Sequence, residues 1–481
     1  MIEIENLSYS YPASGDLALS KVDLEIQDGE YVLLAGRSGS GKTSLLRCLN
    51  GLIPHFYGGS FRGRVAVGGW DTREHSVREL SELTGMVFQD PENQFVTTSV
   101  EREISFGQEN LGRESEEVLR RTRELAVRFS LENLLPRIPQ EISGGEKQRT
   151  IIASVLGMGS GIMALDEPTS QLDLGSAGRI LRLLEEFNRE GMTVVLGEHR
   201  LNRVVPFASR GIMLDRGRVI FDGKPRDLIR SFPWLVRIRE PVGGAVSGPI
   251  GGTALKVRDL SFKYAGGDWV LRHLHVELKK SEVLGVFGTN GSGKSTLARA
   301  IAGLLDGVLG SVSIGGREVG KMTESEKGGK VGIVFQDPNK HLFHDTVHEE
   351  VEFARRQMGL AMDGNVDSLL ARLHLTEYGS RNPRDLSGGQ KQKVAIASVL
   401  SFNPEILILD EPTRGLDLPE KVEIMAMLRR LVCEGCISIM ILTHDLDIIR
   451  TFGDRAAVLK DGAIEFQGDP EQAARIMLGG D

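Results

Sequence analysis

Two glycine-rich loops, each ending in a lysine and a hydroxyl residue, have the residue types and spacing most suited to chemistry. GRSGSGKT at residues 36–43 follows the apolar run Tyr31–Ala35, and GTNGSGKS at residues 288–295 follows Val283–Phe287. In such a loop the backbone N–H groups surround phosphate oxygens, and the following helix presents its positive end. We predict that both loops bind nucleotide phosphates, through Gly36, Ser38, Gly39, Gly41, Lys42, Thr43 and Ser44 and through Gly288, Asn290, Gly291, Gly293, Lys294, Ser295 and Thr296.

The side chains at the end of each loop have separate predicted roles. Lys42 and Lys294 would reach the β- and γ-phosphates of ATP, and the hydroxyls of Thr43 and Ser295 would ligate Mg²⁺. The alternative is a glycine-rich turn that binds nothing. An apolar strand before each loop and a helical pattern after it disfavour that alternative twice over.

An apolar run ending in Asp-Glu also occurs in each half, as IMALDE at residues 162–167 and as ILILDE at residues 406–411. The carboxyl end of a strand is where an α/β sheet binds its ligand. We predict that Asp166 and Asp410 hold Mg²⁺, directly or through water, and that Glu167 and Glu411 are free to polarise the attacking water. Acidic pairs on their own are common and solvated, so the prediction depends on the phosphate loops.

The same motifs recur in the same order, which makes the chain an internal duplication. VFQDP and LDEPT each occur twice, once in either half. A stretch rich in Gly, Pro and Ser separates the halves and is typical of a tether. We predict an α/β fold with two domains, residues 1–237 and residues 254–481, joined by a linker at residues 238–253. Each domain is expected to contain a mainly parallel sheet.

The composition narrows the class of protein. The chain has 481 residues and a formal net charge of −8, so nucleic acid is not an expected partner. Cys433 and Cys436 have no second Cys or His pair nearby, and we expect ordinary cysteines at a helix-to-strand junction in a reducing compartment. No secretory signal is expected at the N-terminus. The uncharged run at residues 150–165 is too short to span a membrane, and we expect a buried helix, a turn and a buried strand.

A third motif pair, ISGGE at residues 142–146 and LSGGQ at residues 386–390, precedes each Asp-Glu strand by the length of a helix. With it the motif set resembles the ATP-binding-cassette family over essentially the whole chain, twice. The resemblance implies P-loop NTPase domains, each with a helical signature subdomain and an antiparallel strand region. It also implies that the two halves pair head to tail within the chain, with ATP between one phosphate loop and the other half's signature. The signature residues are Ser143, Gly144, Gly145 and Glu146, and Ser387, Gly388, Gly389 and Gln390.

Further family positions transfer residue by residue. Tyr11 and Tyr264 match the aromatic residue that stacks on adenine, with a core tyrosine as the alternative in each case. The resemblance implies that Gln89 and Gln336 contact Mg²⁺ and water, that Asp173 and Asp417 cross the dimer interface, and that His199 and His444 contact the γ-phosphate. The chain departs from the family at Glu146, where the signature usually has Gln, and at Glu198, where the second half has Thr443. Neither departure removes an essential group.

The residues after each glutamine narrow the subfamily. DPENQF at residues 90–95 and DPNKHLF at residues 337–343 resemble the ATPases of energy-coupling factor transporters, which import vitamins and transition-metal ions. The resemblance implies membrane scaffold and substrate-binding subunits as partners and a place on the cytoplasmic face of the membrane. We expect Phe95, Leu342 and Phe343 to be exposed for a coupling helix. Fused sugar-importer ATPases and non-transport cassettes acting on the ribosome or DNA remain alternatives.

Overall fold

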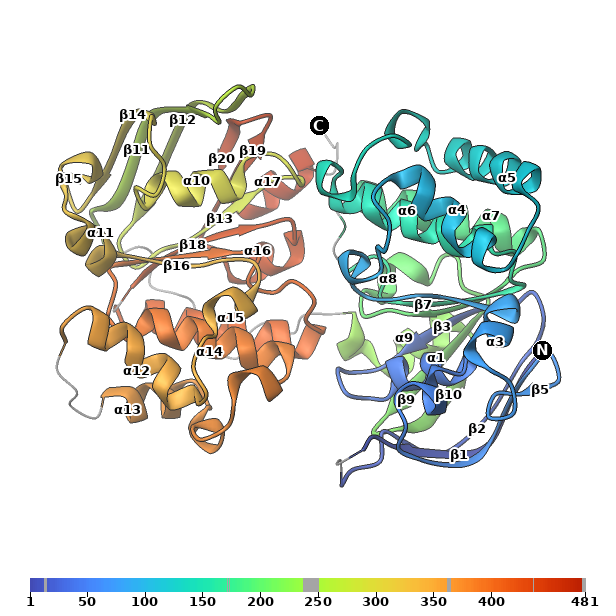
Figure 1. Ribbon diagram of the computed structural model, residues 1–481. Helices are drawn as coiled ribbons and strands as arrows, with labels where there is room; N and C mark the ends of the chain where they lie inside the picture. The colour runs from blue at the N-terminus through green and yellow to red at the C-terminus, as the bar shows by residue number, and fades with distance from the viewer. Residues whose placement is uncertain are drawn as a thin grey trace. The chain divides into compact units, whose positions relative to one another are not determined.

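The computed structural model describes residues 1–12, 15–170, 172, 174–236, 251–360, 365–435 and 437–477. The chain divides into two compact units, Met1–Arg237 and Ile238–Asp481. The predicted linker, apart from its last three residues, lies outside the described residues, as do Asp173 and Cys436. Figure 1 shows that each unit contains strands and helices in the same kind of arrangement.

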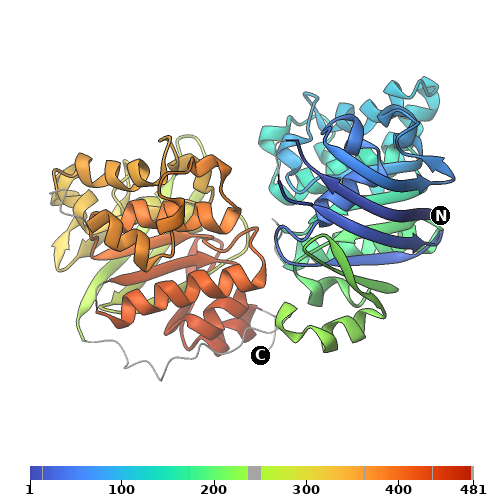
Figure 2. The same cartoon turned by 90° about the horizontal axis from the view of Figure 1, so that it is seen from below.

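The first half contains an antiparallel sheet and a mainly parallel sheet. The antiparallel sheet has the order β2-β1-β4-β5, with β1 (Ile2–Ser10), β2 (Leu19–Ile26), β4 (Ser60–Val67) and β5 (Trp70–Asp71). The second sheet has the order β10-β9-β3-β8-β7-β6, with β3 (Tyr31–Ala35), β6 (Thr84–Val87), β7 (Ile162–Asp166), β8 (Thr193–Gly197), β9 (Arg210–Asp215) and β10 (Arg218–Gly223). β10 pairs antiparallel with β9, and the other pairings are parallel. Figure 2 shows the strands of the antiparallel sheet in blue near the N-terminus.

The second half repeats both sheets. Its antiparallel sheet has the order β12-β11-β14-β15, with β11 (Thr253–Lys263), β12 (Trp269–Lys279), β14 (Leu309–Ile314) and β15 (Arg317–Glu318). Its mainly parallel sheet has the order β16-β17-β18-β13-β19-β20, with β13 (Val283–Phe287), β16 (Val331–Val334), β17 (Ile406–Asp410), β18 (Ser438–Thr443), β19 (Arg455–Lys460) and β20 (Ala463–Gly468). The predicted fold class, two tandem cassettes of α/β type, is confirmed.

Helices connect the parallel strands and cover the sheets. In the first half they are α1 (Lys42–Leu49), α2 (Leu52–His55), α3 (Val77–Leu83), α4 (Val100–Asn110), α5 (Ser115–Arg128), α6 (Gly144–Gly157), α7 (Leu174–Arg189), α8 (Leu201–Val204) and α9 (Pro225–Ser231). In the second half they are α10 (Lys294–Ile301), α11 (Glu324–Lys330), α12 (Val347–Gln357), α13 (Asn365–Arg372), α14 (Gly388–Leu400), α15 (Leu418–Cys433), α16 (Leu446–Phe452) and α17 (Pro470–Met477).

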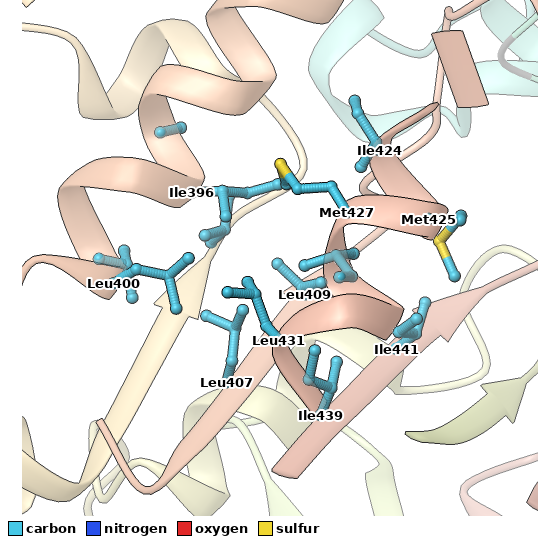
Figure 3. Close-up of a cluster of buried hydrophobic side chains, with 14 of the residues drawn as sticks. Ile396, Leu400, Leu407, Leu409, Ile424, Met425, Met427, Leu431, Ile439 and Ile441 are labelled. Carbon is cyan, nitrogen blue, oxygen red and sulfur yellow. The ribbon is translucent and has the colours of Figure 1, made fainter. Parts of the chain in front are cut away.

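The parallel strands are buried on both faces, which fixes the position of their carboxyl ends. Leu407 and Leu409 of β17 pack in a cluster with residues of α14 and α15, as Figure 3 shows. Their neighbours Ile406 and Ile408 pack on the opposite face, in a cluster with α10 and the antiparallel sheet. Successive strand residues alternate faces, and burial of each such side chain contributes about 1.5–3 kcal/mol. Asp410 therefore follows a strand that is held from both sides.

The run at residues 150–165 forms the second part of α6, a turn and β7, as expected. Across the described parts of the chain, no helix is both long enough and apolar enough for a membrane crossing. Cys48 is buried in α1, and Cys433 is exposed at the end of α15, close to the start of β18.

Candidate functional site

Both phosphate loops are turns that only glycine can form at key positions. Gly41 and Gly293 precede α1 and α10 with φ of 104° and 102°, a left-handed backbone that side chains rarely adopt. A Cβ on Gly36 would lie 2.3 Å from Ser40 Oγ and 2.6 Å from the Leu214 carbonyl oxygen. Any side chain at Gly36 would therefore collide with Ser40 of the loop and with the backbone of Leu214.

The two loop lysines donate back to their own loops. Lys42 Nζ lies 2.8 Å from the carbonyl oxygen of Gly36 and 3.3 Å from that of Arg37. Lys294 Nζ makes the equivalent contacts, at 2.7 Å to Gly288 and 3.1 Å to Thr289. Each ammonium therefore lies over the loop, where phosphate oxygens would add to its carbonyl partners.

The predicted magnesium ligands lie together in both halves. Thr43 Oγ1 donates to Asp166 Oδ2 at 2.7 Å, and Ser295 Oγ donates to Asp410 Oδ2 at 2.5 Å. Burial raises the pKa of both aspartates, partly offset by these hydrogen bonds. A buried carboxylate with a raised pKa is one that a cation would stabilise.

Unsatisfied polar atoms at these loops also fit a bound Mg²⁺–nucleotide. Asp166 Oδ1 is buried without a hydrogen-bond partner, and so are the loop hydroxyls Ser40 Oγ and Ser292 Oγ. Such atoms are rare in native proteins and need a partner. Hydroxyl and carboxylate oxygens are the donor set that Mg²⁺ prefers, so Thr43 with Asp166 and Ser295 with Asp410 would hold the ion. When bound, the ion would neutralise the charge of the nucleotide phosphates.

The two candidate catalytic glutamates share an uncommon backbone. Glu167 and Glu411 have φ of 48° and 51° directly after β7 and β17. A left-handed conformation at a non-glycine residue is strained and often marks a functional position. It turns the glutamate away from the strand while the preceding aspartate remains at the strand end.

In the first half, both carboxylate oxygens of Glu167 have a side-chain partner. Its Oε1 lies 2.6 Å from His199 Nε2, and its Oε2 accepts from Gln89 Nε2 at 3.0 Å. His199 Nε2 is also 3.4 Å from Lys42 Nζ. The structure therefore brings together the predicted base, histidine, Gln-loop glutamine and lysine of this half.

In the second half, Glu411 is paired with a different set of donors. Its Oε1 lies 2.8 Å from His444 Nδ1 and 3.6 Å from Lys294 Nζ, and its Oε2 accepts from Thr443 Oγ1 at 3.0 Å. Burial raises the pKa of Glu411, but the hydrogen bonds and charges of His444, Lys294 and Thr443 outweigh it and hold the pKa below its ordinary value. Glu411 is thus kept ionised, as a proton acceptor requires.

Glu198 occupies the position of Thr443 in the first half, but it accepts hydrogen bonds where Thr443 donates one to the glutamate. It is 1% exposed, and its carboxylate accepts from the Thr169 hydroxyl and from the backbone N–H groups of His199 at 2.9 Å and Arg200 at 3.2 Å. These donors satisfy a buried charge that would otherwise be costly. Glu198 is therefore a positioning residue for the His199 loop, a role that the sequence comparison of the halves located but did not explain.

The candidate adenine-stacking tyrosines differ in their surroundings. The Tyr11 hydroxyl is 3.0 Å from Ser44 Oγ and accepts from Arg47 Nη1 at 3.2 Å. The Tyr264 hydroxyl is 3.4 Å from Thr296 Oγ1, and the residue is 43% exposed. Both tyrosines therefore lie against the helix that follows their own phosphate loop.

The signature motifs form the starts of α6 and α14. Ser143 and Ser387 are the N-caps, and each is closed by a capping box in which Glu146 or Gln390 accepts from the serine N–H. The distances are 2.7 Å for Glu146 Oε2 and 2.9 Å for Gln390 Oε1, so the glutamate serves the same local purpose as the glutamine. Each serine and the glycine directly after it are exposed, which leaves the positive helix ends open to an anion, whereas the second glycine is partly buried in α6 and buried in α14. A cavity of about 260 Å³ opens at Ser387, Gly389 and Gln390.

The residues after the Gln loops correct one sequence expectation. Leu342 is 3% exposed and belongs to the core, and Phe95 is partly buried against the core of its half, so neither is the exposed residue that we expected. The exposed positions are the next ones, Val96 at 64% and Phe343 at 69%. Phe343 thus remains exposed as predicted, and Val96 takes the place expected of Phe95.

Gln94 and its counterpart His341 hold the Gln loops by hydrogen bonds to the backbone. Gln94 accepts from the Phe88 N–H at 3.0 Å and donates to the Met86 carbonyl oxygen at 2.9 Å. His341 Nε2 accepts from the Phe335 N–H at 2.9 Å. These residues therefore tie the segment after each glutamine to the chain just before it, a structural role that their place in a surface-like segment concealed.

Sequence reasoning missed Arg47 and the apolar residues that line a groove beside the first Gln loop, among them Phe106, Ile151 and Val155. Arg47 lies one turn beyond the first phosphate loop, where the same position of α10 is also arginine, Arg299. The groove residues come from α4 and α6, and their apolar spacing on amphipathic helices was the available signal.

Comparisons with known proteins agree with this geometry. Residues 19–170 and residues 271–414 each match the family described as ABC transporter. A Methanosarcina acetivorans protein assigned as an ABC transporter ATP-binding protein is 34% identical over 97% of this chain and 85% of its own length. A Treponema denticola protein with the same assignment is 34% identical over 99% of both chains. A structure described as a model of ribosome-bound archaeal Pelota and ABCE1 aligns with a TM-score of 0.72 over 98% of this chain and 80% of its own, at 22% identity, which shows the fold alone.

Two family matches, one in each half, and relatives of the same organisation over nearly the whole chain lead to one conclusion. The protein belongs to the ABC transporter family as a tandem pair of its ATP-binding domains, and that membership implies that it binds and hydrolyses ATP.

Proposed function

We propose that this chain is the motor subunit of an ABC importer of the energy-coupling factor type, which powers uptake of a vitamin or transition-metal ion. Separate integral membrane subunits would provide the scaffold and bind the substrate, and the motor would work on the cytoplasmic face of the membrane. The observation that carries the proposal is an apolar groove beside the first Gln loop, where a helix of a membrane subunit can dock.

The groove has a volume of about 490 Å³ and combines residues of the Gln-loop segment, α4 and α6. Val96 and Phe106 on its wall are 64% and 41% exposed, and Met158 and Leu111 extend the apolar lining. Gln94, which fixes the strand before Gln89, lines it as well. A hollow apolar surface of this kind fits an amphipathic helix.

The groove is connected to the candidate catalytic base through the chain just before Gln89. Gln89 donates to Glu167, and Gln94 bonds to Met86 and Phe88 at the end of the strand that precedes Gln89. A movement of the groove residues would therefore shift Gln89 and its hydrogen bond to Glu167. A change at the γ-phosphate would, in the other direction, shift the groove residues. The second half offers Phe343 and Phe353 as exposed apolar residues in the corresponding region.

We further propose that the two halves form crossed ATP sites. One site would combine Lys42, Thr43, Gln89, Asp166, Glu167 and His199 with Ser387 and Gly389, and the other would combine Lys294, Ser295, Gln336, Asp410, Glu411 and His444 with Ser143 and Gly145. ATP would close the halves on each other and hydrolysis would reopen them. In a double-mutant cycle on ATP turnover, Ser387→Ala should couple to Lys42→Ala more strongly than to Lys294→Ala. Equal or reversed coupling would contradict the crossed sites.

The transport role is tested at the groove. Val96→Asp with Phe106→Asp, and separately Phe343→Asp, should prevent co-purification of the membrane subunit and abolish uptake, while the ATPase activity of the isolated chain survives. Ile220→Asp, which changes a 49% exposed residue of β10, is the matched control and should retain both. Phe95 is unsuitable, because it packs against the core.

Other outcomes would favour the alternatives. Co-purification with the membrane subunits of a sugar importer would make the chain the fused ATPase of that type. Co-sedimentation with ribosomes, or retention on DNA, would place it among cassette proteins that act on those partners instead.

A further inference from the structure

An insertion distinguishes the first half from the second just after the phosphate-loop helix. Gly51 and Gly303 follow the two helices. Gly63 and Gly310 occupy matching bends of β4 and β14, where a Cβ would meet equivalent backbone carbonyl oxygens of β1 and β11. Residues 52–62 lie between Gly51 and Gly63, and the shorter segment of residues 304–309 lies between Gly303 and Gly310. The first half therefore has five additional residues, which include Phe56 and Tyr57.

We propose that this insertion positions Tyr11, so that the first phosphate loop holds the base of its nucleotide more firmly than the second loop does. The inference rests on the proposed ATP sites and on the expectation, from the family resemblance, that Tyr11 and Tyr264 stack on adenine. Tyr57 acts through Tyr11 and is a positioning residue.

Tyr57 reaches Tyr11 directly and through Arg47. The ring centroids of Tyr57 and Tyr11 are 6.0 Å apart with an interplanar angle of 88°. The Arg47 guanidinium lies 4.3 Å above the Tyr57 ring and donates to the Tyr11 hydroxyl at 3.2 Å. A cation over an aromatic face and edge-to-face rings are both attractive arrangements. Tyr57 thus orients the arginine that fixes the Tyr11 hydroxyl.

The insertion is itself tied to the strand that leads to Tyr11. The Tyr9 hydroxyl donates to the Gly58 carbonyl oxygen at 3.0 Å. The Tyr9 ring packs edge-on against Tyr11 with centroids 4.9 Å apart. Tyr11 is therefore bounded by Tyr9 and Tyr57, with its hydroxyl between Ser44 and Arg47.

The second half uses the corresponding arginine elsewhere. Arg299 lies 6.0 Å from the centroid of Phe335, at the end of the strand before Gln336, and not over a tyrosine of an insertion. Tyr264 packs edge-on against Phe262 at 4.9 Å and contacts Thr296 at 3.4 Å. With 43% of its surface exposed, Tyr264 has more side-chain freedom to lose when a base stacks on it.

The expected difference is the cost of ordering one aromatic side chain, roughly 3- to 10-fold in nucleotide affinity. It should concern the base and not the phosphates, because the insertion touches Tyr11 and Arg47 and leaves the loop lysine unchanged. A ligand without a base should therefore bind equally well with or without the insertion contacts.

The experiment uses the full chain with the second loop disabled by Lys294→Ala and follows binding of a fluorescent ribose-labelled ATP. Tyr57→Leu should weaken ATP binding roughly 3- to 10-fold and leave competition by inorganic tripolyphosphate unchanged. Tyr57→Phe, which keeps the ring under Arg47, should restore the parent affinity. Leu119→Ala, a change at a 50% exposed residue of α5, is the control and should have no effect.

Three outcomes would overturn the proposal: an unchanged ATP affinity in Tyr57→Leu, an equal loss for ATP and tripolyphosphate, or an equal loss at the second loop measured with Lys42→Ala. Tyr11→Leu separates the two levels of inference. If it leaves the ratio of ATP to tripolyphosphate affinity unchanged, the stacking role of Tyr11 itself is wrong. If it lowers the ratio but Tyr57→Leu does not, the insertion has no positioning role and the proposed function stands.

Discussion

The two candidate catalytic glutamates occupy the same backbone position but receive their second hydrogen bond from different parts of the fold. Glu411 Oε2 accepts from Thr443, at the end of the neighbouring strand β18. Glu167 Oε2 accepts from Gln89, because the residue at the position of Thr443 is Glu198, a carboxylate that instead accepts from Thr169. The first carboxylate is thus connected to its Gln loop, next to the proposed docking groove, whereas the second is connected to the sheet.

This difference teaches that identical motifs do not guarantee identical coupling. Both halves have the complete set of predicted groups, so both are expected to turn over ATP. The halves differ in which element donates the second hydrogen bond to the glutamate, the Gln loop in the first half and strand β18 in the second. The following variants test that difference.

The largest effect should come from the glutamates themselves. Glu167→Gln and Glu411→Gln keep the side-chain shape but lose the proton acceptor, which typically costs about 10²–10⁴-fold at the altered site. ATP binding should be largely retained. ATP turnover and nucleotide binding of each single variant are the measurements, and full turnover in either one would mean that its site is silent.

A smaller effect should distinguish the two hydrogen-bond arrangements. Thr443→Val removes the donor to Glu411 at nearly constant shape, and loss of a hydrogen bond to a charged group corresponds to about 1.5–3 kcal/mol, or roughly 10- to 100-fold in turnover. Thr169→Val removes a donor to Glu198 and not to Glu167, so it should change turnover at the first site about 3-fold or less. Each variant is measured with the other site silenced by Glu→Gln. Equal losses would remove the distinction between the halves.

The Gln loops should differ in their response to pH. Burial lowers the pKa of His341 below its ordinary value of 6.5, and its neutral Nε2 accepts from Phe335. As pH falls below 6.5, His341 takes up a proton in the unfolded chain before it does so in the folded chain. The contribution of His341 to the free energy of unfolding should therefore be constant above pH 6.5 and decrease between pH 6.5 and its lower pKa in the folded chain. The slope for one proton is at most about 1.4 kcal/mol per pH unit.

Denaturant unfolding at neutral and mildly acidic pH measures this effect. His341→Gln, which copies Gln94, should flatten the pH dependence of the second half. An unchanged slope in that variant would show that another group is responsible.

The smallest effect is expected at the signature helices. Glu146→Gln keeps the bond to the Ser143 N–H that Gln390 makes to Ser387, so the free energy of unfolding should change by about 0.5 kcal/mol or less. Ser143→Ala, which removes the cap, should cost about 1 kcal/mol. Thermal or denaturant unfolding compares the two, and a larger loss in Glu146→Gln would show that its charge has a partner beyond the cap.

Local motifs were sufficient for the fold and most of the site, because the phosphate loops, the Asp-Glu strands and the capped signature helices each depend on residues close together in the chain. The sequence comparison failed where two adjacent apolar residues divide between core and surface. Leu342 turns into the cluster that contains Val347 and Val351, while Phe343 turns outward, and no local pattern separates them. The partners of Glu198 and Arg47 likewise come from other segments of the chain, and only the folded arrangement reveals them.

The left-handed backbone at Glu167 and Glu411 has a consequence for the evolution and engineering of this protein. A non-glycine residue in that conformation costs roughly 1–2 kcal/mol, which glycine would not incur. The fold therefore gives up stability at two positions to aim two carboxylates. A selection for heat resistance alone should favour glycine there and produce a sturdier chain that no longer works, so thermostable variants must be screened for turnover as well.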